Sequence, residues 1–297
     1  MTQQTNRKHF FLLHFIVGIW GFAPIFGRAI TIPTTHLVWF RMLIAFVSLL
    51  VYILIAQIPL RVSKKELLKF TAVGSLIAFH WICFYGAIKA SNISITLACF
   101  STNALFTALL EPIFFKRKIS WIEIVCSIIA IAAIALILNI NAKFNTGALL
   151  SIVGAMGAAL FTILNSILVK NNDPRTMSLY ELSFGFFILT IVMFFMGELN
   201  SLDSNLTLRN FLLLLLFSTV GTAFTFLIST NLLKYISPYT VNLTVNLEVV
   251  YGIILAYFIF GGDEKMNLQF YIGTAMILFS LLLNAFLKKK WTADSKQ

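Results

Sequence analysis

Long apolar runs alternate with short polar connections along almost the whole chain. A helix needs about 20 apolar residues to cross the hydrocarbon core of a bilayer, and runs of that length recur throughout the sequence. The pattern predicts ten membrane-spanning helices, at residues 10–29, 35–56, 70–89, 93–115, 119–138, 147–169, 177–197, 209–232, 237–260 and 267–287. We interpret the first run as a retained helix, not a cleaved signal peptide, because it is a full span long and contains Trp20, Pro24 and Arg28. We therefore expect an all-α membrane protein.

The composition excludes several classes of protein. Hydrophobic residues make up 59% of the 297 residues and charged residues only 11%, against about 25% in a typical soluble domain. This composition excludes a disordered protein and a nucleic-acid-binding arm, and it nearly excludes a soluble enzyme, because a water-facing surface needs more charge than this. The net charge of +11 is explained by membrane topology. If the ten spans alternate in direction, 16 of the 22 Lys and Arg residues lie on the same side of the membrane as both termini, and five lie on the other side. This bias predicts cytoplasmic termini.

An offset of 145 residues relates the two halves of the sequence. It aligns loops with loops, and it superimposes Lys89 on Lys234 and Phe115 on Phe260. We expect two five-helix repeats, residues 1–145 and 146–297, within one membrane domain. An odd number of helices per repeat forces the second repeat to enter from the opposite face, so the repeats are inverted, as in many alternating-access transporters. The alternative is ten helices without internal symmetry.

Polar residues at mid-span mark the candidate site, because lipid cannot satisfy them. Glu248 lies in the middle of its span, and the offset relates it to Asn103. Further polar or aromatic positions continue these helical faces at Thr107, Glu111, Asn242, Asn246 and Tyr251. These side chains could bind substrate near the membrane midplane, or they could simply bond neighbouring helices together.

Aromatic and ionisable residues in other spans extend this set. His80 could carry a proton or be a neutral, packed histidine. Trp20, Trp81 and Tyr85 could stack on a planar or cationic substrate, although packing is the more ordinary role. Arg41 could pair with an acid, reach water, or bind an anionic group, whereas Arg28 is expected to reach water from the end of its helix.

Two carboxylates are assigned to the ends of spans. Glu111 lies close to Lys116, which favours a salt bridge or a gate over substrate contact. Glu181 is predicted near the start of its helix, where a carboxylate suits the helix dipole, and it could line the cytoplasmic vestibule.

Several segments resemble one family in order along the chain. They are Ile19-Trp20-Gly21-Phe22 with Arg28, Trp39-Phe40-Arg41-Met42-Leu43, His80-Trp81, Leu110-Glu111-Pro112, Asn246-Leu247-Glu248, and Phe260-Gly261 with Phe270-Tyr271-Ile272-Gly273. Together they resemble the EamA type of the drug/metabolite transporter superfamily, in a bacterial branch. Val249 stands where the family often has proline, and Lys116-Arg117-Lys118 stands where an acidic residue often closes the fourth helix.

The resemblance implies a multi-pass protein of the bacterial inner membrane that transports, and often exports, amino acids, nucleosides or drugs. The sequence has no Walker A pattern, so we expect a secondary transporter that uses protons, exchange or the substrate's own gradient. It also has no H-E-x-x-H, G-x-S-x-G or Cys/His cluster, so an enzyme, a metal site and a cofactor are not expected. A passive facilitator or channel is the alternative. The expected partners are a small-molecule substrate and the lipid bilayer, not nucleic acid.

Overall fold

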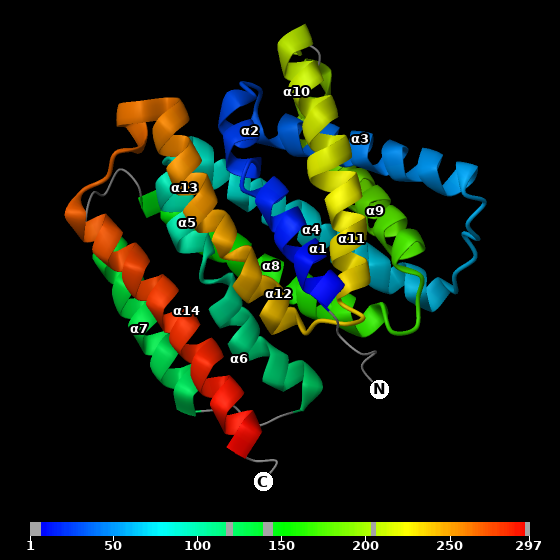
Figure 1. Ribbon diagram of the computed structural model, residues 1–297. Helices are drawn as coiled ribbons and strands as arrows, with labels where there is room; N and C mark the ends of the chain where they lie inside the picture. The colour runs from blue at the N-terminus through cyan, green and yellow to red at the C-terminus, as the bar shows by residue number, and fades with distance from the viewer. Residues whose placement is uncertain (1–6, 117–120, 139–144, 203–205, 295–297) are drawn as a thin grey trace.

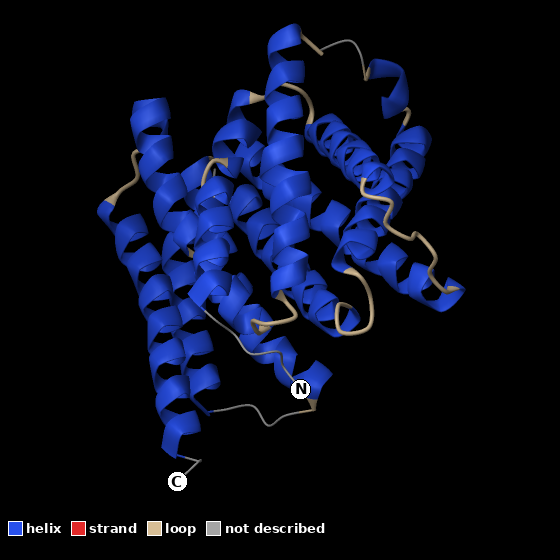
Figure 2. Cartoon of the chain, turned by 45° about the vertical axis from the view of Figure 1, so that its right-hand side comes forward, coloured by secondary structure: helices blue, strands red, loops and turns tan. Residues whose placement is uncertain are grey.

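The computed structural model describes residues 7–116, 121–138, 145–202 and 206–294, and all regular structure in these ranges is helical (Figure 2). The α-helices are α1 (Arg7–Trp20), α2 (Ala23–Ala29), α3 (Thr34–Ile55), α4 (Lys64–Ala90), α5 (Ile93–Phe100), α6 (Asn103–Phe115), α7 (Trp121–Leu138), α8 (Asn145–Leu168), α9 (Pro174–Met196), α10 (Leu208–Ser218), α11 (Thr225–Leu232), α12 (Pro238–Val245), α13 (Leu247–Phe260) and α14 (Leu268–Asp294). Three shorter elements join them: η2 (Glu198–Ser201), η3 (Thr219–Phe224) and η4 (Gly261–Glu264). Arg117 and Lys118 of the predicted basic connection lie outside the described residues.

Eight helical segments in the described part of the chain are long and apolar enough to cross a membrane. They coincide with eight of the ten predicted spans. The fifth and tenth predicted spans correspond to α7 and α14, which pack against each other along one side of the bundle (Figure 1). The sequence therefore located the helical segments correctly, and the structure supports a multi-pass membrane protein.

Side-chain caps decide where many of the helices begin. A side-chain oxygen at the residue before the helix accepts a hydrogen bond from a backbone N–H of the first turn. The capping residues are Ser63 for α4, Asn92 for α5, Asp173 for α9, Thr207 for α10 and Ser237 for α12. Because of these caps, α4 and α9 begin several residues before the apolar runs that predicted them.

Four predicted spans are interrupted helices. The segment of α1 and α2 breaks just before Pro24, whose ring removes a backbone N–H donor. The α10–α11 segment contains the π-helix η3, in which the Thr222 hydroxyl donates to the carbonyl of Phe217. A helix break was not predicted in any of these spans, because hydropathy averages over a whole run.

The other two breaks occupy corresponding positions in the two halves. The first separates α5 from α6 at Ser101 and Thr102, whose hydroxyls donate to the carbonyls of Ala98 and Cys99. The second separates α12 from α13 at Asn246. An offset of 145 residues carries the ends of α5 and α6, at Phe100 and Phe115, onto the ends of α12 and α13.

Helices of the two halves pack mainly against each other. The first-half helix α4 packs on α8 and α9, α3 packs on α9, and α5 packs on α8 and α13. Small residues permit the closest of these contacts: Gly74 of α4 meets Gly185 of α9, and Gly154 of α8 lies against Cys83 of α4. Gly154, Ala158 and Thr162, which follow one another at four-residue spacing on α8, are all buried. The interior of the bundle is thus bounded by both halves.

Two pairs of segments, one from each half, run in opposite directions (Figure 1). The α5–α6 segment descends in that view, whereas α12–α13 ascends, and α7 ascends beside the descending α14. Helix α1 begins and α14 ends toward the same end of the bundle.

Candidate functional site

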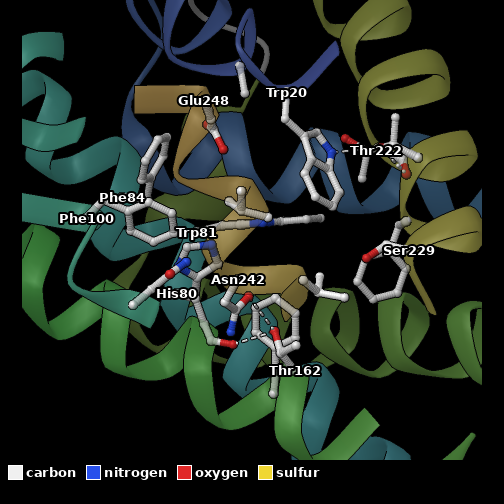
Figure 3. A pocket seen from close by; sticks show the side chains of 18 of the residues that line it. Trp20, His80, Trp81, Phe84, Phe100, Thr162, Thr222, Ser229, Asn242 and Glu248 are labelled. Atoms are coloured by element: carbon white, nitrogen blue, oxygen red, sulfur yellow. Dashed lines mark hydrogen bonds between the residues drawn. The ribbon is translucent and has the colours of Figure 1, made fainter. Parts of the chain in front are cut away.

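A cavity of about 100 Å³ lies where both halves meet, inside the bundle (Figure 3). Its walls come from helices of both halves, including the residues beside the α5–α6 and α12–α13 breaks. The polar and aromatic side chains that line it include Trp20, Arg41, His80, Trp81, Phe84, Tyr85, Phe100, Asn103, Phe161, Thr162, Asn165, Thr222, Thr225, Asn242 and Glu248. Seven of the ten predicted binding residues are in this set.

Arg41 supplies a buried cation to the cavity. Its side chain is only 4% exposed, its Nε donates to the Thr222 hydroxyl at 2.7 Å, and its Nη1 donates to the Tyr85 hydroxyl at 2.5 Å. The guanidinium lies over the rings of Trp81, at 3.8 Å from the centroid, and Phe217, at 4.3 Å. Of the alternatives for Arg41, its burial does not fit a side chain that reaches water, and its direct partners are hydroxyls and rings.

Glu248 supplies a buried carboxylate on another wall. It lies in the first turn of α13, directly after the break at Asn246, and it is 6% exposed. In Figure 3 its carboxylate points into the cavity. Arg41 acts on it electrostatically, but the two side chains form no salt bridge among the contacts of the described residues. The cavity therefore holds a guanidinium and a carboxyl group that are not paired with each other directly.

Aromatic rings form another part of the wall. His80 Nδ1 donates to the backbone carbonyl of Gly154 at 3.0 Å, and its ring stacks on Phe100 with centroids 5.3 Å apart. Trp20 Nε1 donates to the Thr225 hydroxyl at 2.9 Å. These bonds fix His80 and Trp20 in place while one surface of each lines the cavity. His80 and Trp20 are therefore packed side chains that also line the cavity, so packing and binding are compatible roles for them.

A chain of amides and hydroxyls lies on the side opposite Glu248. Asn242 Nδ2 donates to the Thr107 hydroxyl at 2.7 Å, and that hydroxyl donates in turn to the backbone carbonyl of Asn103. Asn103 and Asn242 line the cavity, whereas Thr107 is buried behind them. The buried Asn103 Oδ1 has no hydrogen-bond partner in the described part of the chain, so one polar atom of this wall is unsatisfied.

Several predicted residues lie elsewhere. Tyr251 is 41% exposed and packs beside Gly21. On α13 the buried residue one helical turn after Glu248 is Gly252, so the inward face of the helix does not include Tyr251. Asn246 is buried at the helix break but does not line the cavity. Glu111 is half-buried near the end of α6, outside the cavity wall.

Glu181 is also misplaced by the sequence. The Asp173 cap starts α9 at Pro174, which puts Glu181 two turns inside the helix and fully buried, not at a helix start. It lies behind Asn165, which lines the cavity.

Arg28 is another correction, because it does not simply reach water. It forms ion pairs with Asp263, at 2.8 Å, and with Glu264. The buried Glu264 carboxylate also accepts the backbone N–H groups of Ile93 and Ser94 at the N-terminus of α5, at 3.1 and 2.9 Å. This cluster ties the ends of α2, α5 and α13 together at one end of the bundle.

Hydroxyl-bearing residues of the second half were missed. Thr222, Thr225, Ser229 and Thr230 line the cavity from η3 and α11. Their signal was present, since they recur every three or four residues in an otherwise apolar span, as the stripe at Asn103 and Thr107 does. Asn165 was missed as well, although it is a lone amide near the end of an apolar run.

The chain matches known proteins at the level of a family and of a fold. The model of the EamA-like transporter family matches residues 9–139 and again residues 145–286. No curated protein matches the chain significantly. A solved structure described only as "Crystal structure of protein" covers 95% of this chain and 99% of its own, at 10% identity and a TM-score of 0.70, which shows a shared fold. The two family matches together span nearly the whole sequence, and the chain belongs to the EamA-like transporter family, whose members are membrane transporters of small solutes.

Proposed function

We propose that the protein is a secondary transporter that exports amino acids or related small metabolites from a bacterial cell by alternating access. One observation carries the proposal. A buried guanidinium and a buried carboxylate, Arg41 and Glu248, face the same central cavity without a direct salt bridge between them. Charges buried in this way are expensive unless something compensates them.

A zwitterion would compensate both charges at once. Nε and Nη1 of Arg41 are committed to Thr222 and Tyr85, and the same guanidinium can present its remaining nitrogen to a substrate carboxylate. A substrate ammonium group would lie at Glu248. The surrounding rings of Trp20, Phe84 and Phe161 favour an apolar or aromatic side chain over a second charged group.

The arrangement of the helices supports alternating access. Ten spans in two inverted repeats would place Glu248 and its counterpart Asn103 at equivalent helix breaks on either side of the cavity. Discontinuous helices whose ends meet at a central site are typical of transporters built from inverted repeats. If both termini are cytoplasmic, the cationic loops lie on the cytoplasmic side of the inner membrane, as the positive-inside rule expects.

Flux through purified protein in proteoliposomes tests the proposal. We expect labelled neutral amino acids to exchange against unlabelled pools, and Arg41→Gln and Glu248→Gln each to abolish the exchange. Tyr251→Phe is the matched control, since this side chain lies outside the cavity, and should exchange normally. Flux that never exceeds the substrate's own gradient under any imposed ion gradient would identify a passive facilitator. Absence of any exchange in the wild type would refute the proposal.

A further inference from the structure

A second buried carboxyl lies directly behind the cavity wall. Glu181 on α9 is 0% exposed, and its Oε2 accepts a hydrogen bond of 3.0 Å from Nδ2 of Asn165 on α8, which is 1% exposed. Asn165 lines the cavity and Glu181 does not. One hydrogen bond therefore separates Glu181 from the proposed substrate site.

This pair leaves two acceptor oxygens without partners. Neither Glu181 Oε1 nor Asn165 Oδ1 has a hydrogen-bond partner among the described residues, and both atoms are buried. Buried acceptors of this kind are costly, and such atoms are rare in folded proteins. Both belong to groups that are already joined by the Asn165–Glu181 bond. A proton on Glu181 Oε1 would turn one of the two acceptors into a donor to the other.

No cation near Glu181 would stabilise an ionised form. Asn165 is the side chain that acts on the carboxyl, and no charged group of the described residues does. Of the titratable groups on the helices packed around it, Arg41 of α3 engages Tyr85 and Thr222, His80 of α4 engages Gly154, and Tyr180 of α9 engages the carbonyl of Leu60. Helices α8 and α11 contain no Asp, Glu, His, Lys or Arg.

The backbone of Glu181 is held against α4. Gly74 of α4 packs so tightly on the backbone carbonyl of Glu181 and on Gly185 that even a methyl group has no room there. The side-chain carboxyl is fully buried, and the hydrogen bond from Asn165 connects it to a residue that lines the cavity.

We propose that Glu181 is the proton-binding site that couples transport to proton movement, and that Asn165 connects it to the substrate. This inference rests on the proposed function. In the closed conformation Glu181 is neutral and forms a cyclic pair with the Asn165 amide. A substrate that engages Asn165 breaks this pair, and the Glu181 proton passes to water on the side to which the cavity is open. Glu181 takes up one proton on the opposite side after the substrate has left, so one proton moves against each substrate molecule.

Glu181→Gln is an informative variant, because glutamine reproduces the neutral acid. Its carbonyl oxygen can accept from Asn165 Nδ2, and its amide can donate to Asn165 Oδ1. The variant should therefore fold, bind and exchange substrate, but it cannot release a proton. Asn165→Leu is the complementary change, because it leaves Glu181 in place and removes its connection to the cavity.

Proteoliposomes with the membrane potential clamped at zero separate the steps. With an amino acid that the wild type exchanges, a lumen one pH unit more acidic than the bath should accumulate that amino acid about tenfold. Glu181→Gln should keep exchange but show no accumulation, and its substrate affinity should lose the rise with pH that the wild type shows. Undiminished accumulation in Glu181→Gln, or accumulation driven by a sodium gradient and not by the pH gradient, would overturn the proposal.

An infrared measurement reads the proton directly and does not depend on transport. The difference between wild-type and Glu181→Gln spectra at neutral pH should contain the C=O stretch of a carboxylic acid, shifted by exchange into deuterium oxide. A difference spectrum with only carboxylate bands would overturn the assignment. If the wild type exchanges no amino acid, the proposed function fails, while this spectrum still decides whether Glu181 holds a proton.

Discussion

Replacement of Gly74 by alanine probes a close backbone contact between the two halves. An added Cβ would lie 2.9 Å from the backbone nitrogen of Gly185 and closer still to the carbonyl oxygen of Glu181. These are backbone atoms of α9, so no side-chain rotation can relieve the clash. To reach an ordinary contact distance from the Glu181 oxygen, α4 and α9 must separate locally by about 1 Å, which opens the packing on both sides of the contact.

The magnitude follows from two opposing effects. Alanine favours a helix over glycine by about 0.5–1 kcal/mol, whereas forced overpacking costs about 1–3 kcal/mol and more where backbone must move. We expect Gly74→Ala to lower the free energy of unfolding by about 1–3 kcal/mol. Gly86→Ala on the same helix is the control, because its Cβ would meet only Leu150 Cδ1 at an ordinary 3.6 Å, and it should be neutral or slightly stabilising.

Equilibrium unfolding in mixed micelles of increasing SDS content measures both variants. Gly74→Ala should unfold at a lower SDS fraction than the wild type, and Gly86→Ala at the same or a higher one. Equal stability of the two variants would refute the reasoning, because it would mean that α4 and α9 are not in backbone contact at Gly74.

Three further predictions concern charged residues. Arg41→Lys keeps the charge but cannot hold the Tyr85 and Thr222 hydroxyls together while facing a ligand, so substrate exchange should need about tenfold or more higher concentration, and an unchanged concentration dependence would contradict the assigned role. Glu264→Gln removes the buried partner of Arg28 and should cost about 1–3 kcal/mol of stability by the same SDS titration, whereas Asp263→Asn, at an exposed position, should cost less than about 1 kcal/mol; equal effects would argue against the buried cluster. The hydrogen bond from Arg175 lowers the pKa of Asp173 in the folded protein. The ionised Asp173 therefore stabilises the fold above the pKa that it has in the unfolded chain, and this contribution is lost as the pH falls through its lower folded pKa. Asp173→Asn should be less stable than the wild type at neutral pH, and the difference should vanish in acid.

The contact between Gly74 and the backbone of Glu181 concerns the proposed coupling as well as stability. The contact at Gly74 holds the segment of α9 that carries Glu181, so a variant that loosens it also loosens the hydrogen bond to Asn165. We therefore expect Gly74→Ala to impair accumulation driven by a pH gradient more than it impairs exchange.

Much of the candidate site followed from polarity alone. Asn103, Asn242 and Glu248 stood out because lipid cannot satisfy such groups, and the structure turns all three toward the cavity. His80 and Trp81 followed by the same reasoning, since both lie in mid-span. A helix in a membrane must point its few polar groups inward, so one period of 3.6 residues is enough to assign a face.

The sequence by itself determined the class of protein, the positions of the helices and most of the polar side chains that face inward. Tertiary structure alone decided the partners. Arg41 could have paired with any acid, yet the helix packing places it between two rings and two hydroxyls. Arg28 forms an ion pair with Glu264, which is 236 residues away in the sequence. Tyr251 and Glu181 were misjudged because helix breaks and caps shift which face looks inward. Hydropathy acts locally along each helix, whereas a buried charge is satisfied by whichever neighbour the packing of distant helices brings within reach.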